Sequence, residues 1–279
     1  MSTVAILGAG PIGASIAHTL ALRAWVRDVR LIDAAGSVAA GKALDIRQSG
    51  PVQGYDTRLS GHADSLSAIG ADVIVIADRH DGGEWKGDEG LALVRRLLAA
   101  GATSPLVFAG PGQTWLMEAT VAELGWPADR LVGSAAAAMP AAARALIALD
   151  LTLSGADVHL AACGRPPALV YGWSCATVGG APLSARVAPH RILAVTDQLR
   201  RLWPAGPYAI ASATAPIVEG LISGSRRDVP AVTMLDGEFG VRGLACLMPV
   251  HLGMGRVRAR IEPAFSPQER TEVLNGLRR

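Results

Sequence analysis

The sequence has few cysteines, and they form no pattern that would bind a metal. Only Cys163, Cys175 and Cys246 occur in 279 residues, and no two of them are close enough for a C-x-x-C pair. An odd number of widely spaced cysteines does not support a disulfide framework either. We therefore expect three reduced thiols that pack as small core side chains, and no metal site.

The sequence also lacks long hydrophobic runs. No segment of 18 or more residues is free of charged and turn-forming residues, as a membrane-spanning helix would require. The first apolar run begins at Val4, and no basic, apolar leader precedes it. We expect a cytoplasmic protein that does not associate with a membrane.

Charge of one sign is not in excess. The formal net charge is +2, and acidic and basic residues are spread along the chain. No basic run is interleaved with aromatic residues, so nothing supports a nucleic-acid partner. Because half of the residues are apolar, the chain can bury a sizeable core. We expect a globular protein with one large domain or two ordinary ones.

A glycine-rich turn near the beginning of the chain is the most informative motif. The apolar run 4–7 is followed by GAGPIG at positions 8–13 and then by small apolar residues. This order predicts a buried strand, a tight turn and a helix that together bind a dinucleotide. Gly8 permits the turn, Gly10 lets the backbone approach a pyrophosphate, and Gly13 allows close packing of helix and strand. The unpaired N–H groups at the helix N-terminus would face the anion.

An acidic residue follows the second apolar run at the place where a dinucleotide site needs one. Residues 29–32 lead into Asp33, about 20 residues beyond Gly13. A carboxylate here accepts hydrogen bonds from the adenosine ribose, and residues 34–37 contain no Arg or Lys for a 2′-phosphate. The sequence therefore favours NAD over NADP, and the alternative is a glycine turn that binds no nucleotide. The candidate cofactor-binding residues are Gly8, Gly10, Pro11, Ile12, Gly13 and Asp33.

Further apolar segments predict alternating strands and helices. We expect a helix through 41–47, a short strand at 57–60, a fully buried parallel strand at 71–77 and a helix over the Ala-rich stretch 135–145. Strands that alternate with helices imply right-handed βαβ crossovers. The predicted fold class is α/β, a Rossmann doubly wound parallel sheet with an α/β C-terminal domain.

These motifs and several later segments occur in the order found in the malate/lactate dehydrogenase family, which the chain resembles over nearly its whole length. The later segments are residues 41–45, 49–52, 71–76, 157–159, 174–183, 218–222, 236–240 and 248–253. The resemblance implies a dinucleotide-binding Rossmann domain over 1–135, a substrate-type domain over 136–279, and a homo-dimer or tetramer. The expected subunit contacts are Ile16, Ala17, Leu20, Ala39, Ala43 and Ile46.

The catalytic residue types that the resemblance implies are absent from their expected positions. The family uses a His as base, an Asp that orients it and an Arg that holds the substrate carboxylate. Counting from the matched segments places these at Arg165, Met139 and Ala142. Arginine stays protonated at working pH, so Arg165 cannot replace the base. We expect the chain to have lost 2-hydroxy acid dehydrogenase activity.

The segments that flank the cofactor in the family also differ. The family's Thr-Ala-Gly after the buried strand reads Ala77-Asp78-Arg79 here, and its Thr-Asn-Pro reads Ala109-Gly110-Pro111. The two small residues that allow close approach to the dinucleotide are therefore lost, which leaves occupancy by NAD open.

Three polar residues are candidates for a new site, namely Asp78, His80 and Arg165. His80 could act as acid and base, and Arg165 could bind a small anionic ligand. The alternatives are a solvated loop at 78–81 and an Arg165 that pairs with a structural carboxylate. Three functions stay open: a non-catalytic or regulatory homologue, an enzyme repurposed to a different substrate, and a functional NAD-dependent malate dehydrogenase.

We predict that NAD(H) binds more tightly than NADP(H), because Asp33 would repel a 2′-phosphate and no basic side chain follows it to neutralise that phosphate. Calorimetric titration of the purified protein with each cofactor measures the difference. Equal affinities would contradict the assignment of Asp33 as the ribose acceptor.

Overall fold

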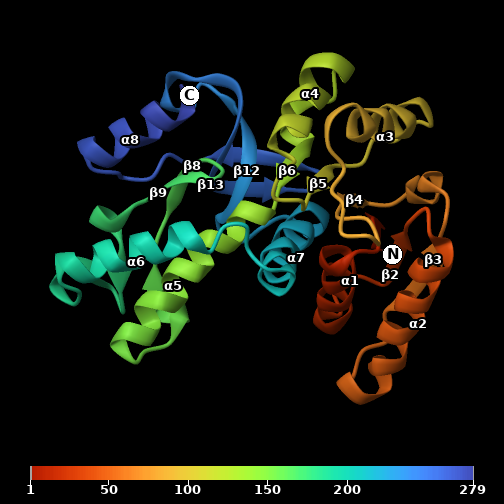
Figure 1. Cartoon of the computed structure of the whole chain (residues 1–279), viewed down its shortest axis with the longest axis horizontal. Coiled ribbons are helices and arrows are strands. Elements are labelled where there is room, and N and C mark those ends of the chain that lie inside the picture. Colours follow the sequence, from red (N-terminus) through yellow and green to blue (C-terminus); the bar gives the residue numbers. More distant parts are fainter. Residues whose placement is uncertain (1, 279) are drawn as a thin grey trace.

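The computed structural model describes residues 2–278, in which one large sheet lies between layers of helices (Figure 1). The first six strands are all parallel, in the order β3-β2-β1-β4-β5-β6. They are β1 (Thr3–Leu7), β2 (Asp28–Ile32), β3 (Arg58–His62), β4 (Val73–Ile76), β5 (Leu106–Phe108) and β6 (Leu131–Gly133). This strand order is that of the doubly wound dinucleotide-binding fold, so the predicted fold class is confirmed.

Helices cover both faces of the sheet. In Figure 1, α3 and α4 lie on one side of the parallel strands, and α1, α2 and α7 lie on the other. The helices are α1 (Pro11–Arg23), α2 (Gly36–Gln53), α3 (Gly87–Ala99), α4 (Thr114–Leu124), α5 (Ala138–Leu151), α6 (Pro189–Arg201), α7 (Pro207–Ser223) and α8 (Pro267–Leu277). Coverage on both faces explains why a strand such as β4 consists only of buried apolar residues.

The local predictions agree with these elements, with shifted ends. The strands expected at 57–60 and 71–77 are β3 and β4, and the helix expected at 41–47 lies inside the longer α2. The Ala-rich stretch 135–145 begins with a short 3₁₀ turn at Ala135–Ala137 before α5 starts. Tertiary packing extends α2, because Ala39, Ala43 and Ile46 are buried along one side of it.

After β6 the chain extends the same sheet with antiparallel strands and adds a small separate sheet. The added strands of the large sheet are β8 (Ala162–Arg165), β9 (Ala168–Tyr171), β12 (Val229–Asp236), β13 (Arg242–Gly253) and β14 (Arg256–Arg260). The small sheet consists of β7 (Val158–His159), β10 (Thr177–Val178) and β11 (Ala181–Pro182). The expected division into 1–135 and 136–279 falls where pairing changes from parallel to antiparallel. It stays a prediction, since one sheet runs through both parts.

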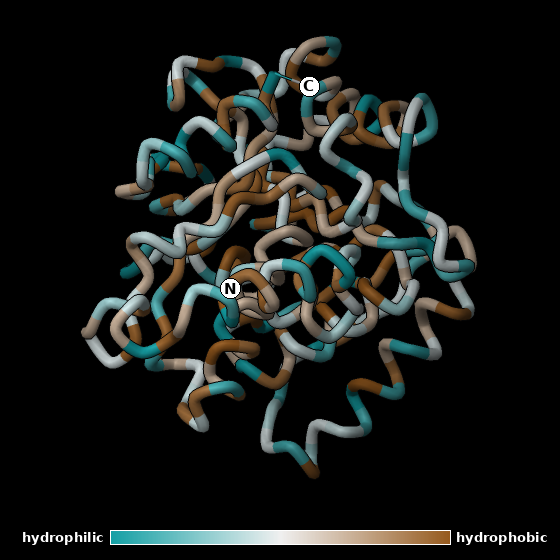
Figure 2. Tube along the Cα trace, turned by 60° about the vertical axis from the view of Figure 1, so that its left-hand side comes forward, coloured by the Kyte–Doolittle hydropathy of each residue, from teal (hydrophilic) through white to brown (hydrophobic). Residues whose placement is uncertain are grey.

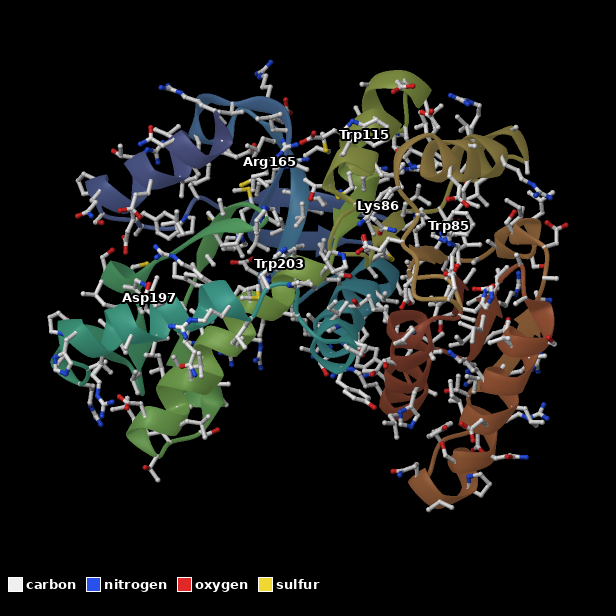
Figure 3. The ribbon with its side chains drawn as sticks, viewed as in Figure 1. Trp85, Lys86, Trp115, Arg165, Asp197 and Trp203 are labelled. Atoms are coloured by element: carbon white, nitrogen blue, oxygen red, sulfur yellow. The ribbon has the colours of Figure 1, made fainter. Side chains whose placement is uncertain are left out.

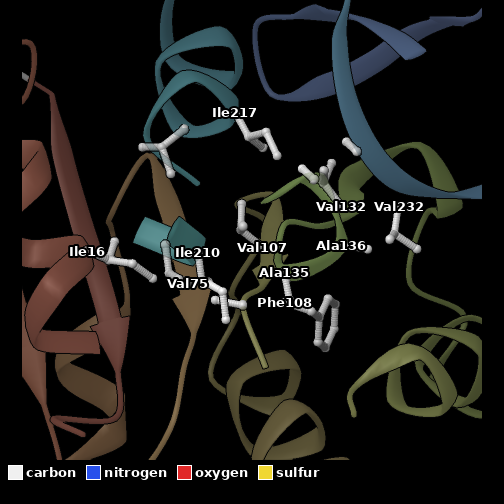
Figure 4. Close-up of a cluster of buried hydrophobic side chains, with 14 of the residues drawn as sticks. Ile16, Val75, Val107, Phe108, Val132, Ala135, Ala136, Ile210, Ile217 and Val232 are labelled. Carbon is white, nitrogen blue, oxygen red and sulfur yellow. The ribbon is translucent and has the colours of Figure 1, made fainter. Parts of the chain in front are cut away.

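The core lies between the parallel strands and the helices around them (Figure 4). Val75, Val107 and Val132 lie on β4, β5 and β6, and they are fully buried together with Ile16 of α1 and Ile217 of α7. Figure 2 shows the same arrangement along the chain, with hydrophobic segments inside and hydrophilic ones mostly outside. The burial of these side chains is the main favourable term for the fold.

Two predictions about buried residues need correction. The side chains expected to form a subunit interface, such as Ile16, Ala17 and Ala43, are buried within the chain itself. They cannot contact a second subunit, because they already pack inside the helix layers of their own chain. Of the cysteines, Cys163 and Cys246 are buried as expected, but Cys175 is only half-buried, since it lies in the short turn Trp173–Cys175.

Within residues 2–278, no helix combines the length and the apolar character needed to cross a membrane. The same residues contain no group of His, Cys, Asp and Glu side chains that could hold a metal ion. Burial raises the pKa of the Cys246 thiol to about 12, so this thiol stays protonated at neutral pH.

Replacing Ile74 by Ala should lower the free energy of unfolding by about 2–5 kcal/mol, because it leaves a cavity beside the fully buried β4. Val52→Ala is the matched control, since the Val52 side chain on α2 is 85% exposed. Urea denaturation measures both, and equal effects of the two substitutions would contradict the packing described here.

Candidate functional site

The candidate site lies at the carboxyl ends of β1 and β4, where the strand order reverses direction. From this point β2 and β3 extend the sheet to one side, and β5 and β6 extend it to the other. Such a switch point leaves a crevice in which open α/β sheets bind ligands. The glycine turn follows β1 and Asp78 follows β4, so the topology brings these two segments together.

The glycine turn has the geometry expected from its sequence. Gly8 has a φ of +115°, a conformation that favours glycine. At Gly13 a Cβ atom would lie 2.0 Å from the carbonyl oxygen of Gly8, so only glycine allows helix α1 to pack this closely. Pro11 is the first residue of α1, where its missing N–H costs no hydrogen bond.

The N-terminus of α1 faces a carboxylate of the chain itself. The N–H of Gly13 donates to one Asp78 carboxylate oxygen at 2.9 Å, and the N–H of Ile12 donates to the other at 3.1 Å. The N–H of Gly10 donates to the backbone carbonyl of Asp78 at 2.9 Å. Asp78 is 4% exposed. The anion position of the turn is therefore filled by Asp78, whose negative charge suits the positive end of the helix dipole.

The ribose acceptor predicted from the sequence is also engaged by its own chain. One carboxylate oxygen of Asp33 accepts hydrogen bonds from the backbone N–H groups of Ala9 (2.9 Å) and His80 (2.8 Å). The other oxygen accepts from the N–H of Ala35 at 3.0 Å and lies 2.9 Å from Nδ1 of His80. Burial opposes ionisation of Asp33, but these hydrogen bonds outweigh it and lower the pKa of the carboxyl group.

The segment that carries Asp78 and His80, residues 78–84, is a folded loop that we call the Asp78 loop. Asp78 forms a β-bridge with Glu84, and the N–H of Arg79 donates to the carbonyl of Gly83 at 2.7 Å. The Arg79 guanidinium pairs with Glu89 on α3 and lies 5.5 Å from the ring centroid of Trp85. The loop is thus tied to α3 and to the glycine turn at once, although His80 and Asp81 keep exposed side chains.

A cavity of about 290 Å³ lies beside Asp33 and is not filled by the loop. Its lining includes Ala34, Ser65, Trp85 and Leu93, and Figure 3 labels Trp85 next to the site. The Ser65 hydroxyl and the Trp85 indole nitrogen are buried and have no hydrogen-bond partner among the described residues. The volume is near the lower end of those of small-molecule pockets.

Arg165 forms a structural ion pair and does not join the other two candidates. Its guanidinium donates to both carboxylate oxygens of Glu118, at 2.6 and 2.9 Å, and Glu118 also accepts from the N–H of Ala245. Arg165 lies on β8 (Figure 3), and β5, β6, β12 and β13 separate β8 from β4. The structure therefore brings Asp78 and His80 together with Asp33, and it places Arg165 elsewhere.

Counting from the matched segments predicted Met139 and Ala142 at two catalytic positions of the family, and the structure places both residues on α5. Met139 is 2% exposed and packs in the core at the start of α5. Arg144, two residues after Ala142, donates to the carbonyl of Gly155 at 2.9 Å.

A small cavity lies at the carboxyl ends of β5 and β6, next to the Arg165-Pro166 turn. It is lined by Gly110, Pro111, Gln113, Pro166 and Trp203 among others, none of them ionisable. Its volume of about 10 Å³ holds roughly one water molecule.

Gln113 is a buried polar residue that the sequence did not point to. Its side chain is fully buried, and its carbonyl oxygen accepts from the N–H of Gly110 at 2.9 Å. Its amide nitrogen has no partner among the described residues. This carboxamide lies three residues after Gly110, the position at which the resemblance implies an Asn in the family. The only signal in the sequence is a glutamine just before the helix that follows a buried strand.

Comparison with known proteins shows the family to which the chain belongs. Residues 2–84 match the model of the lactate/malate dehydrogenase NAD-binding domain. The malate dehydrogenase of Thermomicrobium roseum is 30% identical in sequence, over 97% of this chain and 93% of that protein. The chain belongs to the malate/lactate dehydrogenase family. The match to an NAD-binding domain confirms NAD as the predicted cofactor.

Solved structures of the malate/lactate dehydrogenase family have the same fold. The malate dehydrogenase from Salinibacter ruber superposes with a TM-score of 0.88 at 27% identity, covering 98% of this chain and 93% of that one. The lactate dehydrogenase from Cryptosporidium parvum, solved with lactic acid and NAD, also has a TM-score of 0.88, at 22% identity. It covers 99% of this chain and 95% of its own.

The residues that would hold NAD in this family member are thus present, but the Asp78 loop uses their polar groups. Gly8, Gly10, Gly13 and Asp33 have the arrangement that a dinucleotide needs. The N–H groups of α1 and the oxygens of Asp33 are already hydrogen-bonded to the loop.

Replacing Asp33 by Asn should lower the free energy of unfolding at pH 7 by about 1–3 kcal/mol, because the buried carboxylate accepts several hydrogen bonds. The pKa of Asp33 is lower in the folded state than its unfolded value of about 3.9. Its stabilisation is therefore complete above that value and is lost as pH falls through the folded pKa.

Denaturation of both proteins between pH 7 and pH 3 measures this difference. The difference in the free energy of unfolding between wild type and Asp33→Asn should become smaller toward pH 3. The matched control is Asp56→Asn on the exposed loop before β3. A gap that is the same at all pH values would show that the charge of Asp33 does not stabilise the fold.

Proposed function

We propose that this chain is an NAD-binding member of the malate/lactate dehydrogenase family that has lost 2-hydroxy acid dehydrogenase activity. The observation that carries the proposal is the lack of ionisable side chains around the small cavity beside Pro166, together with Met139 and Ala142 at the positions of the orienting Asp and the carboxylate-binding Arg. A non-catalytic or regulatory role of the scaffold follows.

Chemistry supports the proposal at each missing role. A positioned general base is worth about 10²–10⁴-fold in rate, and it must exchange a proton near neutral pH. Arg165 cannot do so, and its pairing with Glu118 directs its charge to a structural carboxylate. A substrate carboxylate would also find no free guanidinium at Ala142, because the nearby Arg144 is bonded to Gly155.

A second candidate is an active NAD-dependent malate dehydrogenase. Similarity over nearly the whole chain to proteins named malate dehydrogenase favours it. This candidate requires a proton acceptor other than the residues at the family positions, and Gln113 cannot serve because a carboxamide does not titrate. The third candidate, a repurposed enzyme with Asp78 and His80 at its centre, would have to work without Arg165.

Three further properties belong to the same proposal. We place the domain boundary near residue 135, we expect a cytoplasmic protein, and we expect self-association as a homo-dimer or tetramer. The subunit contacts would have to involve exposed residues, because the first set of expected residues is buried.

With NADH and saturating oxaloacetate or pyruvate, the purified protein should show no meaningful turnover, and malate and lactate should not be oxidised with NAD. The physical reason is the joint absence of the base, its partner and the carboxylate clamp, which act as a unit. Absorbance of NADH is the readout, with the Salinibacter ruber malate dehydrogenase as positive control. Turnover on the order of 10 per second would show that the protein is an ordinary dehydrogenase.

A further inference from the structure

The contact between Asp78 and helix α1 has the form of a bound anion. Two N–H groups at the start of the helix donate to the two oxygens of one carboxylate, at 2.9 and 3.1 Å. The fit is close, since a Cβ atom at Gly10 would lie 2.4 Å from the carboxyl group of Asp78 and 2.3 Å from the carbonyl of Arg79. The space that Gly10 leaves open for a pyrophosphate is therefore occupied by the Asp78 side chain and by the backbone carbonyl of Arg79.

We infer that Asp78 is a built-in anion that competes with the pyrophosphate of NAD, so that NAD binds only after the Asp78 loop has moved away from the glycine turn. The inference rests on the proposed NAD-binding function and adds a residue that sets the affinity for NAD. It concerns binding alone and is independent of whether the protein catalyses a reaction.

The loop covers two parts of the cofactor site at once, which makes the competition direct. Asp78 takes the N–H groups that would face the pyrophosphate. His80, two residues later, takes the Asp33 oxygens that would accept from the ribose. The cavity beyond Asp33, lined by Ser65 and Trp85, stays open. The loop thus blocks the ribose and pyrophosphate positions and leaves the adjoining cavity accessible.

Hydrogen bonding and electrostatic repulsion both predict that removal of the Asp78 carboxylate raises the affinity for NAD. The N–H groups of Ile12 and Gly13 cannot donate to Asp78 and to a phosphate oxygen at the same time. A pyrophosphate beside a retained carboxylate would also face a like charge in a buried place, where repulsion is strong. Removing the carboxylate therefore frees two donors and removes the repulsion, whereas a neutral side chain of the same shape removes only the repulsion.

Calorimetric titration with NAD tests the inference on three variants of the full chain. Asp78→Ala should bind NAD about tenfold or more tightly than wild type. The substitution removes the hydrogen-bonded carboxylate that competes with the pyrophosphate for the N–H groups of α1. Asp78→Asn should bind with intermediate affinity. Asp56→Ala is the matched control for net charge, because Asp56 is exposed before β3, at the opposite end of the parallel strands. It should bind NAD as wild type does.

A second measurement needs no ligand. In the free wild-type protein, hydrogen exchange at the N–H groups of Ile12 and Gly13 should be slow, because Asp78 accepts from both. Exchange at these two groups should be about tenfold faster in Asp78→Ala. Melting temperatures of the variants show whether each is folded, and Asp78→Asn serves as the test variant if Asp78→Ala is not.

Unchanged or weaker NAD binding in a folded Asp78 variant would overturn the inference, as would binding of NAD to neither wild type nor variant at millimolar concentration. Unchanged exchange at Ile12 and Gly13 would do the same. Failure of the proposed function gives different results. Absence of NAD binding to every variant contradicts NAD binding itself, and NADH turnover with oxaloacetate contradicts the loss of activity, whereas unchanged affinity and unchanged exchange in a folded Asp78 variant contradict only the role of Asp78.

Discussion

The N–H groups at the beginning of helix α1 must have an acceptor, and the site is arranged around this requirement. Gly8, Gly10 and Gly13 are buried and Ile12 is half-buried, and a buried donor without a partner is costly. In this chain the acceptor is Asp78, which follows the neighbouring strand β4. Asp78 and His80 lie on the same loop, so the contact of Asp78 with α1 accompanies the hydrogen bonds of His80 to Asp33.

The need for a partner also explains the contacts of Arg165. The sequence predicts Arg165 at the position of the family's base, and Glu118 on α4 faces it with both carboxylate oxygens. A half-buried guanidinium without such a partner would be unfavourable, so the substitution and the ion pair belong together. The nearby cavity is then lined by glycine, proline, tryptophan and a glutamine.

Much of the fold and part of the site could be predicted from the sequence, because the relevant signals are local. Gly8, Gly10 and Gly13 lie within six residues, and steric limits on the turn make their roles predictable. Asp33 ends a buried strand, so its side chain must lie at the carboxyl edge of the sheet. The burial of Ile16 and Ala43 inside the chain was not predictable, since an apolar helix face looks the same whether it meets its own sheet or a second subunit.

The sequence by itself determined the doubly wound fold and the place of the glycine turn, because each depends on short-range pattern or on residue type. Only the tertiary structure decided what the polar residues contact. Asp78 and Gly13 are 65 residues apart, and Arg165 and Glu118 are 47 apart. Such pairs form when the strand order brings distant segments together. The sequence of residues 78–81 is compatible both with a solvated loop and with a loop that fills the anion site.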